Sequence, residues 1–119
     1  FQLDDWINLP GDSCLPDPDP DNPVTWVVPP SGRVTPVVRG DNEGIAVRIT
    51  SNPVARSICE AVGSPIVSTS ANITSQPPAM SCLEIKAVFK DQVYCVEGDL
   101  GRLDKPTQIR DARTGQVLR

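Results

Sequence analysis

The stretch "PIVSTSANITSQPP", residues 65–78, places small polar residues directly after a short apolar run. Five small residues occupy positions 68–72, and four of them carry a hydroxyl or an amide. Small side chains let a phosphate approach exposed backbone N–H groups closely. A Ser/Thr/Asn cluster is also typical of a turn that satisfies only its own backbone, and taken alone the cluster favours that simpler interpretation. The segments that flank this stretch are therefore needed to distinguish a turn from a ligand site.

The segments before this stretch predict a strand, a helix and a second strand. Residues 45–50 ("IAVRIT") are rich in β-branched residues, which favour strands. An Asn-Pro pair then supplies a helix N-cap and a first helical residue, and a Gly follows ten residues later, so residues 53–62 are predicted to be helical. Residues 65–68 ("PIVS") predict the next strand.

The remaining segments continue this alternation. Residues 24–28 ("VTWVV") and 92–98 ("QVYCVEG") predict strands, and a capping box of Ser81 and Glu84 starts a further helix. Residues 107–119 predict a terminal hairpin around an Arg-Thr-Gly turn, whereas the Pro- and Asp-rich residues 10–23 predict a loop. Strands alternating with short helices indicate an α/β domain with a mixed sheet.

The charges are unevenly distributed along a chain of 119 residues with a formal net charge of −4. Six Asp and no Lys or Arg lie between residues 4 and 21, whereas residues 102–119 carry five basic and two acidic residues. The net charge argues against a surface built to coat nucleic acid, and the basic end is where an anionic ligand is expected. The length is enough for one domain with a modest core.

Cysteine and histidine usage limits the possible chemistry. His is absent, and the four Cys, at positions 14, 59, 82 and 95, include no C-x-x-C pair, so a zinc site is not expected. The spacing favours reduced thiols of a cytoplasmic protein over a disulfide framework. No apolar run approaches the length of a membrane span. Without His, a Ser-His-Asp triad is excluded, and reactions driven by positioning and charge stabilisation, such as nucleotidyl transfer, stay open.

Arg48 interrupts the apolar run of the predicted strand at residues 45–50. A guanidinium in such a strand is costly unless it reaches the edge, a carboxylate or a ligand. The alternative is a strand with one solvent-exposed face, on which Arg48 is hydrated and binds no ligand. The run is more apolar than strict alternation predicts, which favours a ligand.

Four segments together resemble the YrdC-like family, the threonylcarbamoyl-AMP synthases: "PVTWVV", "GIAVRIT", "SNPVARSICEAVGSPIVSTSANITSQPP" and "GRLDKPTQIRDARTGQVLR". They occur in the family's order and at its spacings. The resemblance implies an α/β fold, a twisted mixed β-sheet flanked by short helices. It also implies that residues 1–119 form a partial domain, incomplete at the N-terminus, with residues 1–22 as a lead-in and residues 23–119 as the family's core portion.

The resemblance implies a nucleotidyltransferase that makes L-threonylcarbamoyladenylate and pyrophosphate from L-threonine, bicarbonate and ATP. That product serves the t6A37 modification of tRNA, so tRNA and other proteins of the pathway are further implied partners. Mg²⁺ is expected to accompany ATP, with no metal held by Cys or His, and the expected compartment is the cytoplasm. The resemblance assigns no catalytic side chain. It assigns threonine binding to Arg48, Ser68 and Thr107. It assigns nucleotide binding to Ser70, Asn72, Arg119 and Thr25.

Two departures from the family pattern limit how far the family's activity can be expected of this chain. Residues 21–23 read Asp-Asn-Pro where the family has Pro-Gly-Pro, and the chain contains no Lys-x-Arg element, which in the family grips the triphosphate. The chain by itself is therefore expected to be inactive or nearly so. The alternative is an RNA-binding or ribosome-maturation module without catalysis, which the net charge of −4 disfavours. A third option, the related domain of hydrogenase-maturation carbamoyltransferases, fits the short length and the "IRDARTG" ending less well.

Overall fold

The computed structural model describes residues 2–101 and 106–119. Three charged residues of the basic segment, Arg102, Asp104 and Lys105, lie outside the described residues. Backbone contacts divide the chain into two compact units. The first comprises Phe1–Pro65 together with Arg102–Arg119, and the second comprises Ile66–Gly101.

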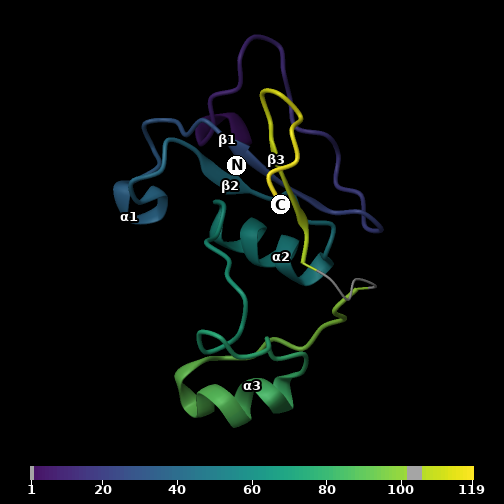
Figure 1. Cartoon of the computed structure of the whole chain (residues 1–119). Coiled ribbons are helices and arrows are strands. Elements are labelled where there is room, and N and C mark those ends of the chain that lie inside the picture. Colours follow the sequence, from purple (N-terminus) through teal and green to yellow (C-terminus); the bar gives the residue numbers. More distant parts are fainter. Residues whose placement is uncertain (1, 102–105) are drawn as a thin grey trace. The chain divides into compact units, whose positions relative to one another are not determined.

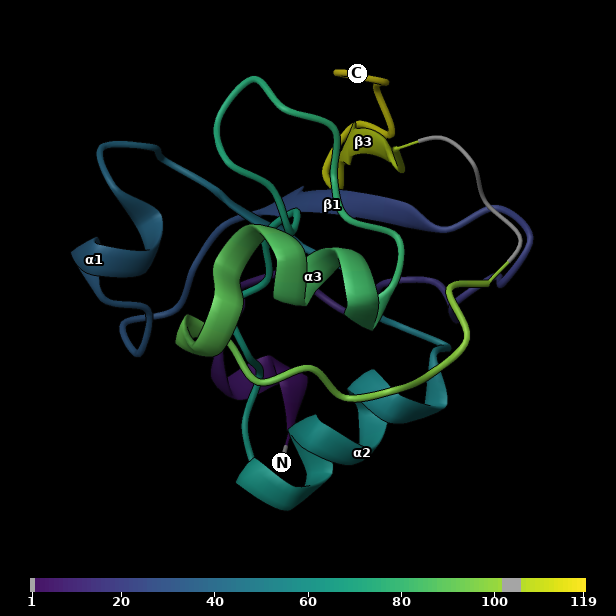
Figure 2. The same cartoon turned by 90° about the horizontal axis from the view of Figure 1, so that it is seen from below.

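A three-stranded mixed sheet forms the centre of the first unit, which confirms the predicted α/β class (Figures 1 and 2). Its strands are β1 (Val24–Val28), β2 (Ile45–Val47) and β3 (Gln108–Asp111), in the order β2-β1-β3. β2 pairs antiparallel with β1, whereas β3 pairs parallel with it. The central strand was predicted from its β-branched and aromatic residues.

Helix α2 (Pro53–Val62) has the boundaries that the sequence predicts. The side chain of Asn52 accepts hydrogen bonds from the backbone N–H groups of Val54 and Ala55, at 3.0 and 3.1 Å. Gly63 ends the helix in the left-handed region, with φ of 71°. Both ends of α2 are therefore fixed by local chemistry. A shorter helix, α1 (Pro36–Arg39), begins at a proline in a stretch where no helix was predicted.

Three strand predictions differ from the structure. The strand predicted for residues 45–50 is wrong beyond Val47, where β2 ends and Arg48 follows. There the chain turns toward α2, and the Thr50 hydroxyl accepts a hydrogen bond from the N–H of Asn52 at 3.1 Å. Residues 65–68 and 92–98 form no strand. These runs have strand-like composition but no neighbouring strand, and a β-branched residue stabilises a strand only where it packs on a sheet.

The buried core is small and lies at the end of β1. Among the described apolar residues, Ile7 and Val28 are buried, with exposed fractions of 3% and 1%. Ile7 forms an antiparallel bridge with Pro30, and the N–H of Ser31 donates to the carbonyl of Trp6 at 2.9 Å. The start of the chain, predicted only as a lead-in, thus packs against the end of the central strand.

The short 3₁₀-helix η1 (Leu3–Asp5) is contacted by a basic side chain, Arg33, which follows Pro30 by three residues. Arg33 makes an ion pair with Asp5, with 3.4 Å between nitrogen and oxygen, and its guanidinium lies 5.6 Å from the centre of the Trp6 ring. Residues 10–23, which follow, contain neither helix nor strand, as predicted.

The predicted terminal hairpin is present beyond β3. Arg110 and Val117 form an antiparallel bridge, and the N–H of Asp111 donates to the carbonyl of Gln116 at 2.9 Å. The turn between them includes Gly115, with φ of 73°, a conformation that favours glycine. β3 is therefore paired on both sides.

The second unit contains α3 (Cys82–Phe89) and the 3₁₀-helix η2 (Lys90–Gln92). The predicted capping box is confirmed in part: the Ser81 hydroxyl accepts from the N–H of Glu84 at 3.1 Å. The Glu84 carboxylate reaches the N–H of Met80 at 2.7 Å, one residue earlier than a standard capping box.

The preference for reduced thiols is wrong for two of the four cysteines. Cys82 and Cys95 form a disulfide, with 5.7 Å between their Cα atoms, whereas Cys14 and Cys59 are free. The chain turns back after α3 and η2, which brings Cys95 next to the start of α3. Sequence spacing does not reveal such a return. Separately, no helix within residues 2–101 and 106–119 is long and apolar enough to cross a membrane.

Candidate functional site

Two predicted site residues, Thr25 and Thr107, are in direct contact. Their hydroxyl oxygens lie 2.9 Å apart at a partly buried position. Thr25 is in β1 and Thr107 immediately precedes β3, so the parallel pairing of these strands produces the contact. The pair offers one free hydroxyl hydrogen or lone pair to a ligand beside it, because each hydroxyl both donates and accepts.

Arg48 directly follows β2. The last paired residues of β1 and β2 are Trp26 and Val47, so the sheet pairing ends one residue before Arg48. Arg48 and Thr25 therefore each flank the last pair of these two strands in the sequence, and no pairing joins them among the described residues.

The surroundings of Arg48 correct its predicted place within a strand. It follows β2, and the alternation of half-buried and exposed residues continues through it, with Ile45, Val47 and Ile49 half-buried and Arg48 exposed. Among the described residues it makes no hydrogen bond and no ion pair. The positive charge of Arg48 is therefore accessible to an anion from the solvent.

Arg119 forms backbone hydrogen bonds with Ile109 of β3. Its carbonyl accepts from the N–H of Ile109 at 2.9 Å, and its own N–H donates to the carbonyl of Ile109 at 3.2 Å. Ile109 is the register partner of Thr25. Thr25, Ile109 and Arg119 therefore follow one another across the sheet.

The predicted residues of the serine-rich stretch belong to the second unit. Ser68 and Ser70 are exposed and Asn72 is half-buried. Within the described part of the chain, the N–H groups of residues 68–70 donate to no other group, so they are open to solvent or a ligand. The side chain of Asn72 donates to the carbonyl of Ile73 at 3.1 Å, which is the behaviour of a turn.

A short loop fixes the end of this stretch. The N–H of Ala79 donates to the carbonyl of Ala71 at 2.8 Å, and the N–H of Gln76 donates to the carbonyl of Ile73 at 2.9 Å. Ser75 adopts a left-handed conformation, with φ of 68°. Residues 71–79 thus form a closed polar loop, whereas the N–H groups of residues 68–70 donate to no described group.

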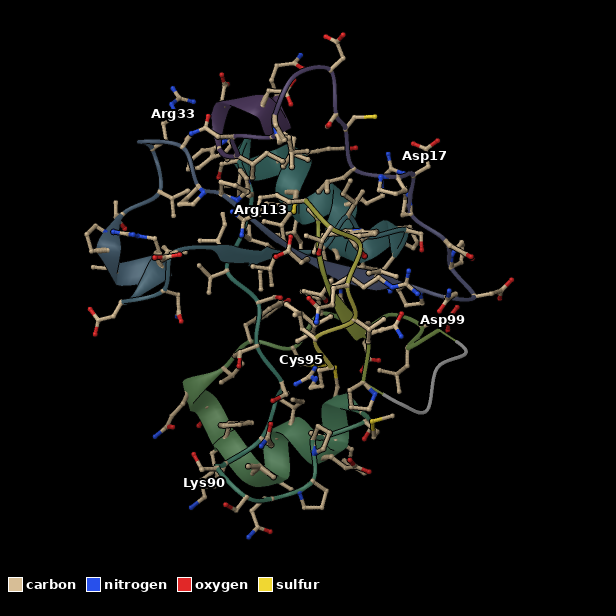
Figure 3. The ribbon with its side chains drawn as sticks, turned by 45° about the horizontal axis from the view of Figure 1, so that its top comes forward. Asp17, Arg33, Lys90, Cys95, Asp99 and Arg113 are labelled. Atoms are coloured by element: carbon tan, nitrogen blue, oxygen red, sulfur yellow. A yellow bond between two sulfur atoms is a disulfide. The ribbon has the colours of Figure 1, made fainter. Side chains whose placement is uncertain are left out.

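The surroundings of Asp111 shift its pKa. The N–H of Arg113 donates to its carboxylate at 2.8 Å, and the Arg113 guanidinium lies 3.6 Å away. Stabilisation of the charged form, chiefly by that backbone hydrogen bond, lowers the pKa of Asp111 below its usual value of 3.8. Arg113 is thus partly neutralised at the turn (Figure 3).

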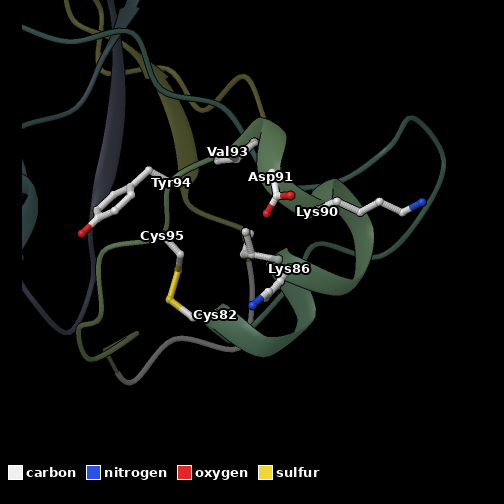
Figure 4. Close-up of a pocket in the computed structure, with 8 residues that line it drawn as sticks. Cys82, Lys86, Lys90, Asp91, Val93, Tyr94 and Cys95 are labelled. Carbon is white, nitrogen blue, oxygen red and sulfur yellow. A yellow bond between two sulfur atoms is a disulfide. The ribbon is translucent and has the colours of Figure 1, made fainter.

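No group of three or more His, Cys, Asp or Glu side chains within residues 2–101 and 106–119 is arranged to hold a metal ion. The second unit does contain a cavity of about 330 Å³, beside the disulfide (Figure 4). None of the predicted site residues lines it. Sequence reasoning missed this cavity because it depends on the pairing of Cys82 with Cys95.

The sequence is similar to one family model and to several curated proteins. A family model described as telomere recombination, Sua5/YciO/YrdC, matches residues 18–119. Two relatives named threonylcarbamoyl-AMP synthase, from Chromohalobacter salexigens and Hahella chejuensis, are 43% and 47% identical over 82% of this chain. A third, from Xanthomonas oryzae pv. oryzae, is 40% identical over 98% of it. The chain spans 52%, 53% and 65% of the length of these three relatives, respectively.

Proposed function

Because the chain belongs to the Sua5/YciO/YrdC family, we propose that it is part of an L-threonylcarbamoyladenylate synthase. The reaction would join L-threonine, bicarbonate and ATP and release pyrophosphate, for the t6A37 modification of tRNA in the cytoplasm. The observation that carries the proposal is the identity of 40–47% to three proteins named threonylcarbamoyl-AMP synthase. The contact between Thr25 and Thr107 and the exposed position of Arg48 support the assignment of roles.

In the proposed reaction, a carbamate oxygen on the threonine nitrogen attacks the α-phosphate of ATP. A new P–O bond forms, and the bond from the α-phosphate to the leaving pyrophosphate breaks. The charge that develops lies on phosphate oxygens, so the chain has to supply positioned donors and positive charge rather than an acid or a base. An exposed arginine, free N–H groups and hydroxyls are donors of this kind.

The roles follow from the chemistry of each group. Arg48, unpaired among the described residues, would bind the threonine carboxylate through two parallel hydrogen bonds. Thr107 and Ser68 would contact threonine, and Thr25, at 2.9 Å from Thr107, would connect that subsite to the nucleotide. Arg119 would carry positive charge toward the phosphates.

The serine stretch of the second unit would bind the nucleotide. The free N–H groups of residues 68–70 would donate to phosphate oxygens, with Ser70 adding its hydroxyl. Asn72 would act indirectly, because its side chain is already engaged with the carbonyl of Ile73. Mg²⁺ would arrive with the triphosphate of ATP, which commonly supplies much of its coordination.

We further propose that residues 23–119 form the family's core portion and residues 1–22 a lead-in, and that this chain alone has little or no activity. The relatives are longer than the chain, and it contains no Lys-x-Arg element. The remaining contacts to the triphosphate would then come from the part of the relatives that this chain does not match.

A chimera separates the family role from the activity of the isolated chain. Residues 18–119 would replace the matching part of the Hahella chejuensis synthase, and ATP- and threonine-dependent pyrophosphate release would be measured. We expect activity from the chimera and little from the 119-residue chain. In the chimera, Arg48→Gln should raise the KM for threonine about tenfold or more, whereas Arg56→Gln, an exposed arginine on α2, should not.

Three results would count against these proposals. An inactive but folded chimera would argue against the synthase assignment. Robust turnover by the isolated chain would contradict its proposed inactivity. RNA binding that falls steeply with salt, without affinity for ATP, would instead favour an RNA-binding module.

A further inference from the structure

The Cys82–Cys95 disulfide holds a unit that has almost no core. No described side chain within Ile66–Gly101 is buried, and the disulfide joins the first residue of α3 to the segment after η2. Polypeptides shorter than about 40 residues usually need a disulfide, a metal or a partner to stay folded. The folded state of this unit therefore depends strongly on one covalent bond, the disulfide.

A cavity of about 330 Å³ opens beside this bond, and both cysteines line it (Figure 4). Its volume is at the lower end of the range of about 300–1,000 Å³ that is typical of small-molecule sites. Lys86 follows Cys82 by four residues on α3, so the two side chains share a helix face. Lys90 and Asp91 line another part of the cavity. Figure 4 shows the side chain of Lys90 pointing away from the disulfide, whereas the Lys86 ammonium lies beside Cys82, so the positive charge of Lys86 favours a small anion there.

We propose that the disulfide and this cavity form a thiol–disulfide exchange site for a small anionic thiol. The incoming thiolate attacks the Cys95 sulfur, a mixed disulfide forms there, and Cys82 leaves as a thiolate. A second thiolate then attacks the mixed disulfide, which releases the oxidised small disulfide and leaves Cys95 reduced. Two thiols are oxidised and one protein disulfide is reduced.

The position of Cys82 makes it the better leaving group. It is the first residue of α3, where the helix dipole stabilises a negative charge, and Lys86 lies one turn further along. A thiol that ionises more readily leaves faster in disulfide exchange. Cys95 is not part of a helix, so departure of Cys82 makes Cys95 the sulfur under attack.

Hydrogen bonds connect the disulfide to the serine stretch. Glu84 on α3 accepts from the N–H of Met80 at 2.7 Å, and the neighbouring Ala79 donates to Ala71 at 2.8 Å. Reduction would free residue 95 from α3 and loosen this series of contacts. The effect on ligand binding by residues 68–70 rests on the proposed function, as does a cytoplasmic location, where disulfides are usually transient or redox-sensing.

The test uses the 119-residue chain with Cys14→Ser and Cys59→Ser, which removes the two free thiols. Reduction would be followed by mass spectrometry with glutathione (anionic), 2-mercaptoethanol (neutral) and cysteamine (cationic) at equal thiolate concentration. We expect glutathione to react about threefold or more faster than cysteamine. Lys86→Gln should abolish that preference, whereas Arg56→Gln, the same charge loss on α2, should preserve it. The first mixed disulfide should map to Cys95.

Hydrogen exchange on the same samples provides the second measurement. Reduction should remove protection from the Ala79 amide, and the amides of β1 should keep theirs. Equal rates for the three thiols, a mixed disulfide on Cys82, or reduction only in denaturant would each overturn the proposal. None of these measurements involves ATP or threonine, so failure of the synthase assignment would leave them unaffected.

Discussion

The hydroxyl oxygens of Thr25 and Thr107 lie 2.9 Å apart, although the two residues are separated by 82 positions in the sequence. The contact exists because β3 pairs parallel with β1. The contact joins the start of β1, the central strand, to the residue that immediately precedes β3. Two residues assigned to ligand binding thereby also stabilise the fold.

A double-mutant cycle would measure this contact. Thr25→Val or Thr107→Val should each cost about 1 kcal/mol of unfolding free energy, because each leaves a partly buried hydroxyl without its partner. The double variant should cost less than the sum of the two. Urea denaturation gives the three values, with Thr69→Val, at an exposed position, as the control. Additive costs would show that the two hydroxyls do not interact.

Gly44 is predicted to tolerate no side chain. A Cβ added there would lie 2.8 Å from Cγ1 of Val27 and 3.3 Å from the carbonyl oxygen of Val28. Gly44→Ala should therefore destabilise the chain by about 1–3 kcal/mol through overpacking at the β1–β2 pair. Gly32→Ala is the matched control, because an added Cβ meets no atom within 4 Å there. Equal melting temperatures for the two variants would contradict this account.

Asp111 should make stability depend on acidity. Its pKa is lowered below 3.8 in the folded chain, so the folded state binds its proton less readily than the unfolded state does. Its stabilisation is fully present above pH 3.8 and is lost as the pH falls through the folded-state pKa.

Urea unfolding of the native chain and of Asp111→Asn checks this dependence. The native chain should be the more stable at about pH 6, and the difference should shrink toward about pH 3. Asp41→Asn, which removes an exposed carboxylate, serves as the control. A difference that grew on acidification would contradict the lowered pKa.

The exposed apolar side chains predict self-association. Val37, Leu83 and Tyr94 are 94%, 82% and 89% exposed, whereas Ile7 and Val28 are the buried apolar residues among those described. Such surface favours association in water. Light scattering should give a mass above that of one chain, increasing with concentration, and Leu83→Lys should lower it. A single-chain mass at all concentrations would count against the prediction.

Local signals predicted the helices well. Asn52 and Gly63 mark the two ends of α2, and Ser81 with Glu84 marks the start of α3. Each signal acts within a few residues, so the sequence contains the whole interaction. The short α1 was missed because a single turn has too few residues to show a hydrophobic period.

Long-range features were predicted poorly, for a physical reason. The strand-like composition of residues 65–68 and 92–98 gives no strand, because a strand needs a partner that the sequence does not name. The Cys82–Cys95 pair depends on the return of the chain after η2. The predicted site residues came from the family resemblance, and the register of the sheet then showed that Ile109 lies between Thr25 and Arg119.

The parallel pairing of β1 with β3 also governs how this chain folds during synthesis. β1 pairs locally with β2, but the 82 residues that separate Thr25 from Thr107 must be made before β3 can add to it. At about 5–20 residues per second, translation of that separation takes about 4–16 seconds. During this interval one edge of β1 has no strand beside it, which is when the nascent chain is most exposed to wrong pairing.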